Sequence, residues 1–156
     1  MDIQKLKADF QYLLPKHALT RLAGLLAGAK LGGLTTLMIE QFVKHYQVNT
    51  KEMMGKIQDY KTFNAFFSRP LIPSARTINY NADAVTYPVD GKISQFGKIE
   101  DKFLFQAKNH YYTTELLLAD AKEAAAFQNG DFITIYLSPK DYHRVHIPFD
   151  GTLDKM

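Results

Sequence analysis

The sequence predicts an α+β protein in which N-terminal amphipathic helices are followed by a β-rich barrel or sandwich body with one inserted helix. Three observations predict this fold class. Apolar residues recur at helical spacing in residues 1–62, and short strand-like segments fill residues 63–156. One alanine-rich segment with helix start and stop signals interrupts the strands. We therefore expect a helical, membrane-associating region at 1–62 and a β-rich body at 63–156.

Helices are expected in the first region, interrupted at Pro15 and at the pair Gly32–Gly33. The apolar residues with helical spacing are Leu19, Leu22, Leu25, Leu26 and Ala29, then Leu34, Leu37, Met38, Phe42 and Tyr46. Basic residues stand where they could border these stripes, at Lys16, Arg21, Lys30 and Lys44. Such helices either lie in the plane of a membrane interface or pack on the protein's own core, and the pattern leaves both interpretations open.

The second region has strand-like segments at residues 84–89, 92–99, 102–107, 131–137 and 144–149. Between them, Asp120 can cap a helix with Glu123 three residues on, and Asn129–Gly130 can end it. The strings "PVDGKI" at 88–93 and "PFDGTL" at 148–153 repeat a pattern whose Asp-Gly pair predicts a tight turn with positive φ. This repetition favours a quasi-symmetric barrel or sandwich.

Composition narrows the classes of function. The 156 residues carry no cysteine, so disulfides and thiolate chemistry are excluded. Residues 1–62 hold nine basic and five acidic residues, whereas residues 63–156 hold ten and eleven. A mildly basic, apolar N-terminal region suits an anionic membrane surface, and it lacks the dense basic clusters of a nucleic-acid-binding protein. Its uncharged stretches are shorter than the roughly 20 residues of a spanning helix, and its first residues lack the layout of a signal peptide.

The segment "SPKDYHRVHIPFDG" at 138–151 holds the candidate chemical groups. In an extended strand His143 and His146 would face opposite sides, and the flanking prolines argue against a helix. Zinc would need a third strong ligand, for which only Asp90 or Asp141 is at hand, so no metal site is predicted. Two separate tasks for two imidazoles fit better, and Asp90 could orient one of them.

Several strings together resemble the bacterial, membrane-associated type of phosphatidylserine decarboxylase. They are "TFNAFFSRPL", "YPVDGKISQFGKI", "FQAK" and "FQNGDFITIYLSPKDYHRVHIPFDG". The resemblance implies an enzyme that converts phosphatidylserine to phosphatidylethanolamine and CO2 through a pyruvoyl Schiff base. In this family the precursor cleaves itself at a Leu-Gly-Ser-Thr sequence, and the serine becomes the pyruvoyl cap of a C-terminal α chain. The part before the cut becomes the β chain.

The resemblance also implies roles for residues of this chain. Asp90 and His146 correspond to two members of the self-cleavage triad, and His143 corresponds to the residue that serves decarboxylation. From the residues themselves, Tyr142 could hydrogen-bond near the substrate, and Arg69 and Lys140 could meet a lipid phosphate. The expected partners are the α chain, phosphatidylserine and an anionic membrane, on the cytoplasmic face of the bacterial inner membrane. A homodimer is compatible with the sequence.

One departure from the family pattern affects activity. The four serines, Ser68, Ser74, Ser94 and Ser138, follow Phe, Pro, Ile and Leu, so none belongs to a Gly-Ser cleavage site. We expect the chain to be inactive alone and to represent the N-terminal β-chain portion, either as a fragment or as a naturally short relative. Phe63, Phe66 and Phe67 could line an acyl-chain groove or pack in a core. The alternative function is a non-catalytic module that binds lipid surfaces.

Overall fold

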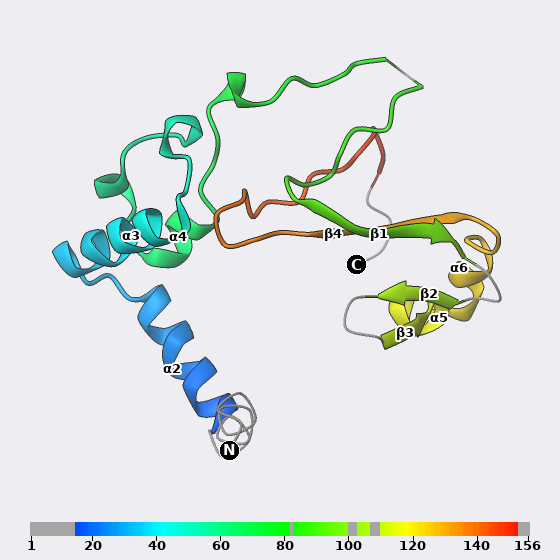
Figure 1. The fold of residues 1–156 in the computed structure, drawn as a ribbon, viewed down its shortest axis with the longest axis horizontal. Coiled ribbons are helices and arrows are strands. Elements are labelled where there is room, and N and C mark those ends of the chain that lie inside the picture. Colours follow the sequence, from blue (N-terminus) through cyan, green and yellow to red (C-terminus); the bar gives the residue numbers. More distant parts are fainter. Residues whose placement is uncertain (1–14, 82, 100–102, 107–109, 153–156) are drawn as a thin grey trace, which may run out of the picture. The chain divides into compact units, whose positions relative to one another are not determined.

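The computed structural model describes residues 15–81, 83–99, 103–106 and 110–152, and the chain forms two compact units, Met1–Ile72 and Pro73–Met156 (Figure 1). The composition changes at residue 63, but residues 63–72 belong to the first unit. Phe66 is part of the hydrophobic core of that unit, and Leu71 forms a β-bridge with Met53. Mixed α+β architecture, with helices at the N-terminal side, is confirmed.

The first unit contains both predicted helices. Helix α2 (Lys16–Gly28) follows Pro15, whose fixed φ suits a helix start. Helix α3 (Gly33–Tyr46) begins after Gly32, which has a φ of 58° that favours glycine, and ends at Gln47 in the left-handed conformation. Among the described residues no single helix is long and apolar enough to cross a bilayer. The two helices meet that test of length and composition only as a pair, bent by 111° at the break.

A small core holds the first unit together. Ile39 of α3 and Phe66 of α4 (Phe63–Phe67) are fully buried, beside Val48 and Met53. The 3₁₀ turns η1 (Thr50–Glu52) and η2 (Ile57–Asp59) connect α3 to α4. The ring of Phe42 meets the rings of Phe63, Phe66 and Phe67 at centroid distances of 5.0, 6.2 and 6.1 Å. These phenylalanines therefore pack within a core.

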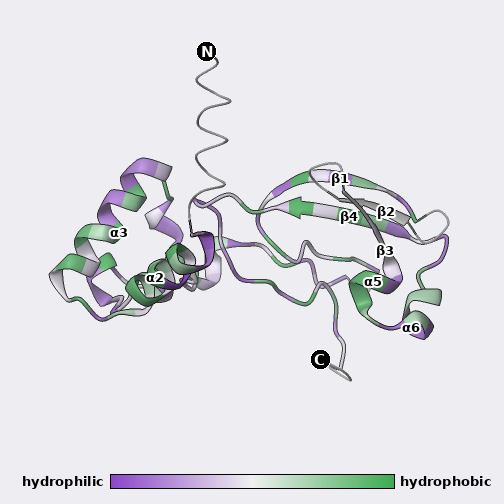
Figure 2. Cartoon of the chain, turned by 90° about the horizontal axis from the view of Figure 1, so that it is seen from below, coloured by the Kyte–Doolittle hydropathy of each residue, from purple (hydrophilic) through white to green (hydrophobic). Residues whose placement is uncertain are grey.

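The two helices differ in how much they bury. No residue of α2 is buried, and its leucines are 47–73% exposed. Figure 2 shows hydrophobic stretches along this helix. In α3 the buried positions are Thr35 and Ile39, whereas Leu34 and Leu37 are 53% and 50% exposed. The face of α3 that packs therefore includes Phe42 of the predicted stripe, but it is centred on Thr35 and Ile39 and not on Leu34 and Leu37.

The second unit begins with the 3₁₀ turn η3 (Pro73–Ala75) and contains two separate two-stranded antiparallel sheets. Strand β1 (Lys92–Lys98) pairs with β4 (Asp131–Tyr136), and the register shifts between Ile93 and Gln95. Strand β2 (Phe103–Gln106) pairs with β3 (His110–Thr113). Three of the five predicted strand segments are confirmed, and β3 was not predicted. The described residues contain no barrel or sandwich.

The predicted helix of the second unit is present, with an unpredicted neighbour. In α6 (Ala121–Ala125) the carboxylate of Asp120 accepts hydrogen bonds from the backbone N–H groups of Lys122 and Glu123, at 2.9 and 3.1 Å. Asn129, with a φ of 62°, ends the segment as expected. Helix α5 (Thr114–Leu118) precedes it, and its N-cap Thr113 accepts from the N–H of Leu116.

Two of the predicted strands, at 84–89 and 144–149, are wrong as strands, although the segments run alongside each other. The backbone N–H and the hydroxyl of Thr86 both donate to the carbonyl of Pro148, at 3.0 and 2.8 Å. The N–H of His146 donates to the carbonyl of Pro88 at 2.7 Å. Proline has no N–H to donate, so this pairing cannot extend into a regular ladder. The green and red ribbons of Figure 1 follow these neighbouring segments.

The positive φ expected at the two Asp-Gly turns is also wrong. Neither Gly91 nor Gly151 lies in the left-handed region. At Gly91 the requirement for glycine comes from close approach. A Cβ there would lie 2.7 Å from the carbonyl oxygen of Tyr136 and 2.8 Å from Cγ2 of Ile135. A Cβ at Gly151 would meet nothing within 4 Å. The two turns share a sequence pattern but differ in their environment.

Candidate active site

The turn at residues 138–141 fixes the start of the histidine segment. Asp141 closes it, because Oδ2 of its carboxylate accepts hydrogen bonds from both the backbone N–H and the hydroxyl of Ser138, each at 2.7 Å. The N–H of Asp141 donates back to the carbonyl of Ser138 at 2.9 Å. This side chain therefore serves turn geometry, a common use of aspartate.

His143 is anchored to the same turn. Its Nε2 lies 3.0 Å from the carbonyl oxygen of Ser138, which can only accept, so Nε2–H is the donor. This contact selects the tautomer protonated at Nε2 when the imidazole is neutral. His143 is half-buried.

His146 has a different partner. Its Nε2 lies 3.0 Å from the hydroxyl of Tyr142, four residues earlier, and the two rings stack with centroids 5.5 Å apart. Tyr142 is buried, with 9% exposure, whereas His146 is exposed. A buried ring therefore supports a more accessible imidazole. The two histidines have separate surroundings, as the sequence analysis expected, although the segment between them is not a regular strand.

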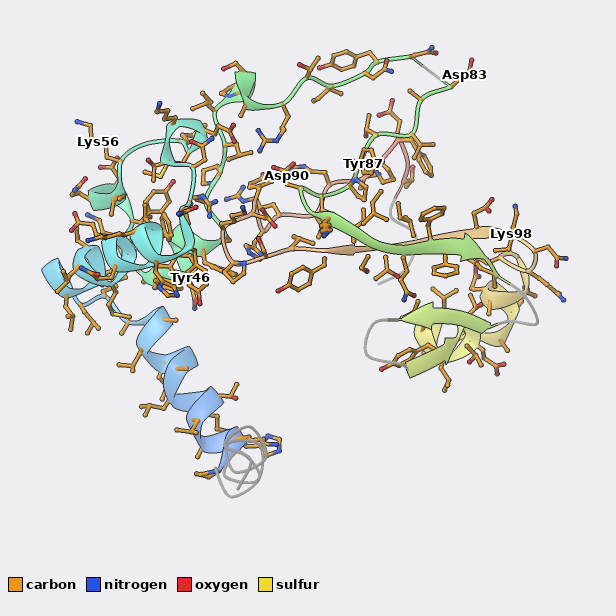
Figure 3. The ribbon with its side chains drawn as sticks, in the orientation of Figure 1. Tyr46, Lys56, Asp83, Tyr87, Asp90 and Lys98 are labelled. Carbon is orange, nitrogen blue, oxygen red and sulfur yellow. The ribbon has the colours of Figure 1, made fainter. Side chains whose placement is uncertain are left out.

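Asp90 lies in the turn before β1, as the label in Figure 3 shows. Its carboxylate is held by Arg76 (Nε to Oδ1 3.1 Å, Nε to Oδ2 2.9 Å), and Nη2 of Arg76 also donates to Oδ2. The two side chains are 30% and 44% exposed. Sequence reasoning missed Arg76, because an arginine in a proline-containing connector carries no local pattern that points to a partner fourteen residues away.

One cavity of about 540 Å³ brings three of the predicted residues together. Asp90, Tyr142 and His146 line it, together with Arg76, and the remaining lining comes mostly from residues 77–79 and 84–89. A few polar groups converging in a mainly apolar cavity are typical of ligand and active sites. His143 is not among the lining residues. The arrangement can orient an imidazole and move a proton at the wall of the cavity.

The other predicted residues are not among those that line this cavity. Arg69 belongs to the first unit, is 3% exposed, and places its guanidinium carbon 5.3 Å from the centre of the Phe66 ring. Lys140 is exposed in the turn that Asp141 closes. In the described parts of the chain, no three His, Asp or Glu side chains gather closely enough to hold a metal ion.

Comparison with known proteins concerns the same part of the chain. A family model described as phosphatidylserine decarboxylase matches residues 63–156, more than half of the sequence, and this match includes every residue that lines the cavity. The chain belongs to the phosphatidylserine decarboxylase family. A second model, described as PSD, matches residues 6–47.

Curated relatives agree with this assignment to the phosphatidylserine decarboxylase family. The phosphatidylserine decarboxylase proenzyme of Shewanella baltica is 49% identical over 156 residues, which cover 99% of this chain and 53% of the relative. That of Actinobacillus pleuropneumoniae is 53% identical over 155 residues, covering 98% of this chain and 52% of the relative. The chain therefore spans about half the length of the curated relatives it matches.

Proposed function

We propose that this chain is the β-chain portion of a self-cleaving phosphatidylserine decarboxylase, which converts phosphatidylserine to phosphatidylethanolamine and CO2 when a C-terminal α-chain segment completes it. The observation that carries the proposal is the cavity that Asp90, Tyr142 and His146 all line. These residues come from segments more than fifty positions apart in the sequence, so the fold gathers them.

In self-cleavage, His146 acts as the base that takes the proton from a serine hydroxyl of the C-terminal segment. In this chain Nε2 bonds to the hydroxyl of Tyr142, and in the completed precursor the serine hydroxyl takes that place. Nε2 then accepts the serine proton, and Nδ1 carries the N–H that Asp90 can accept. The Asp90 carboxylate, at the wall of the same cavity, orients the imidazole and stabilises its protonated form. A carboxylate that orients a histidine in this way acts without taking the proton itself.

Decarboxylation requires a pyruvoyl group, made from that serine and absent from this chain. The cavity fits such a group, because a hydroxyl, an imidazole and a carboxylate surround a mainly apolar space in which a polarised carbonyl can be held. When bound, the group supplies the electron sink for the departing carboxylate. His143, in its protonated form, then delivers the proton on Nδ1 to the substrate carbon, since its Nε2–H is engaged by Ser138.

We also propose that the C-terminal segment completes a barrel or sandwich on the second unit. Large apolar side chains stand exposed there: Phe96 is 78% exposed and Ile133, opposite it on β4, is 50% exposed. Val145 and Ile147 beside the histidines are 77% and 67% exposed. Exposed apolar surface of this kind marks a surface to which another segment binds. The α-chain segment is the expected occupant, because the chain spans about half of its relatives.

Helix α2 supports a peripheral attachment to the membrane on its cytoplasmic side. Its leucines are exposed, and Lys16 and Arg21 flank them along the wall of a surface cavity of about 810 Å³. Leucine side chains with adjoining basic residues are typical of helices that lie in the interface of an anionic bilayer. The same feature would serve the alternative function, a lipid-binding module without catalysis. Only a test of catalysis therefore distinguishes the two functions.

The test is to join this chain to the C-terminal half of the Shewanella baltica proenzyme. We expect the product to split into two chains on a denaturing gel and to release CO2 from carboxyl-labelled phosphatidylserine. Asp90→Asn and His146→Ala should stay uncut, whereas His143→Ala should split but release no CO2. Asp131→Asn and His45→Ala, at exposed positions outside the cavity, are the controls. A product that stays uncut, or one in which His146→Ala splits normally, would contradict the proposal.

A further inference from the structure

Arg76 binds the carboxylate of Asp90 through a fork of two nitrogens. Nε lies 3.1 Å from Oδ1 and 2.9 Å from Oδ2, and Nη2 donates to Oδ2 as well. The third nitrogen, Nη1, donates to the carbonyl of Ala75 at 2.5 Å. A planar guanidinium that is tied to the backbone on one side restrains both the position and the plane of the carboxylate on the other.

The location of this ion pair suggests more than a contribution to folding. Both side chains line the cavity that Tyr142 and His146 also line. They are 44% and 30% exposed, and ion pairs with this much solvent contact contribute little to stability. Oδ1 of Asp90 accepts one contact from Arg76, the longer of the two made by Nε, so it retains the capacity to accept an imidazole N–H.

We infer that Arg76 is a positioning residue for self-cleavage: it holds the Asp90 carboxylate in the place and plane from which Asp90 orients His146. The inference rests on the proposed function, in which Asp90 and His146 serve cleavage. Arg76 touches neither the serine nor the substrate in this role. Its effect on cleavage passes through Asp90.

The inference is tested in the completed precursor. Arg76→Gln, which keeps a polar side chain but loses the fork and the charge, should slow self-cleavage by between about tenfold and a hundredfold, the cost of a misplaced catalytic group. Arg76→Lys keeps the charge without the fork and should remain slowed. After cleavage is complete, kcat and KM for phosphatidylserine should change much less than the cleavage rate, because Asp90 acts on His146 in cleavage and only borders the cavity in decarboxylation. A general loss of structure would change all three quantities.

A double variant isolates the path of the effect. Once Asp90 is replaced by Asn, adding Arg76→Gln should slow cleavage no further. Lys98→Gln, which breaks a comparable ion pair with Asp131 outside the cavity, should cleave at the parent rate. If the parent cleaves and Arg76→Gln cleaves equally fast, or if the double variant is slower than Asp90→Asn, the role of Arg76 is overturned and the proposed function stands. An uncut parent overturns both.

Discussion

The hydroxyl of Tyr142 lies 3.0 Å from Nε2 of His146, and the planes of the two rings are inclined by only 21°. The tyrosine is buried and the histidine is exposed. The imidazole therefore rests on a fixed aromatic surface and is oriented by one hydrogen bond, so its second nitrogen has a defined direction. Tyr142 therefore supports His146, a contact that the sequence did not indicate.

Replacing Tyr142 by Phe should separate the hydrogen bond from the ring stacking. We expect the free energy of unfolding to fall by about 1 kcal/mol, the usual value of one such bond. The nitrogen chemical shifts of the His146 imidazole should also change, because its tautomers lose a bonding partner. Urea denaturation and nitrogen NMR measure the two effects. Tyr136→Phe, at a residue that is 60% exposed, is the control, and equal effects of both changes would argue against the contact.

Asp141→Ala should destabilise the histidine segment. The change removes the acceptor of two 2.7 Å hydrogen bonds from Ser138, and bonds to an ionised carboxylate are stronger than neutral ones. We expect a loss of about 2–3 kcal/mol in urea denaturation and a changed NMR signal of His143, which is bonded to the same serine. Asp131→Ala breaks only an exposed ion pair with Lys98 and should cost less than about 1 kcal/mol. The reverse order would show that the turn does not depend on Asp141.

The two Asp-Gly turns should respond differently to the same substitution. Gly91→Ala places a methyl group against the backbone of Tyr136 and should destabilise the chain by about 1–3 kcal/mol. Gly151→Ala has open space around it and should change stability by less than about 0.5 kcal/mol. Chemical denaturation of the two variants gives the comparison directly. Similar losses at both positions would contradict the close approach of Gly91 to β4.

Attachment to membranes should depend on the leucines of α2. The triple change Leu22→Ser, Leu25→Ser and Leu26→Ser should abolish most of the flotation of the chain with vesicles that contain phosphatidylserine. Neutral phosphatidylcholine vesicles should bind the unchanged chain less well, because basic residues flank these leucines.

The control for this experiment is the triple change Leu116→Ser, Leu117→Ser and Leu118→Ser in α5. These leucines are 74%, 55% and 41% exposed, close to the 55%, 73% and 47% of the three in α2. Flotation should survive this change. If both triple variants float equally well, or if lipid charge makes no difference, the attachment through α2 is refuted.

The sequence predicted best what depends on neighbouring residues. The starts of α2 and α3 at Pro15 and Gly32, and the cap of α6 at Asp120, follow from local backbone chemistry. Prediction was weaker where contacts with other parts of the fold decide which residues are buried. The buried face of α3 is centred on Ile39 because residues beyond the helix, including Phe66, pack there. A helical pattern alone does not indicate which of several adjoining stripes will find a partner.

At the candidate site, too, the sequence predicted local features better than contacts between distant segments. His143, His146 and Asp90 could be named from their chemistry and from the resemblance, and two of them line one cavity. The contacts that orient them could not be named. The bond from Tyr142 to His146 needs a bent segment, and the fork of Arg76 on Asp90 needs two loops to meet. Neither arrangement leaves a periodic signal in the sequence.

The pairing of Thr86 with Pro148 joins positions that are 62 residues apart. Closing a loop of that length costs roughly 4 kcal/mol of chain entropy, which the contacts between the two segments must offset. During synthesis on the ribosome, the segment before Asp90 can therefore pair with residues 146–148 only after nearly all of these 156 residues have emerged. Under the proposed function, scission of the precursor can then begin only after this part of the polypeptide has been made.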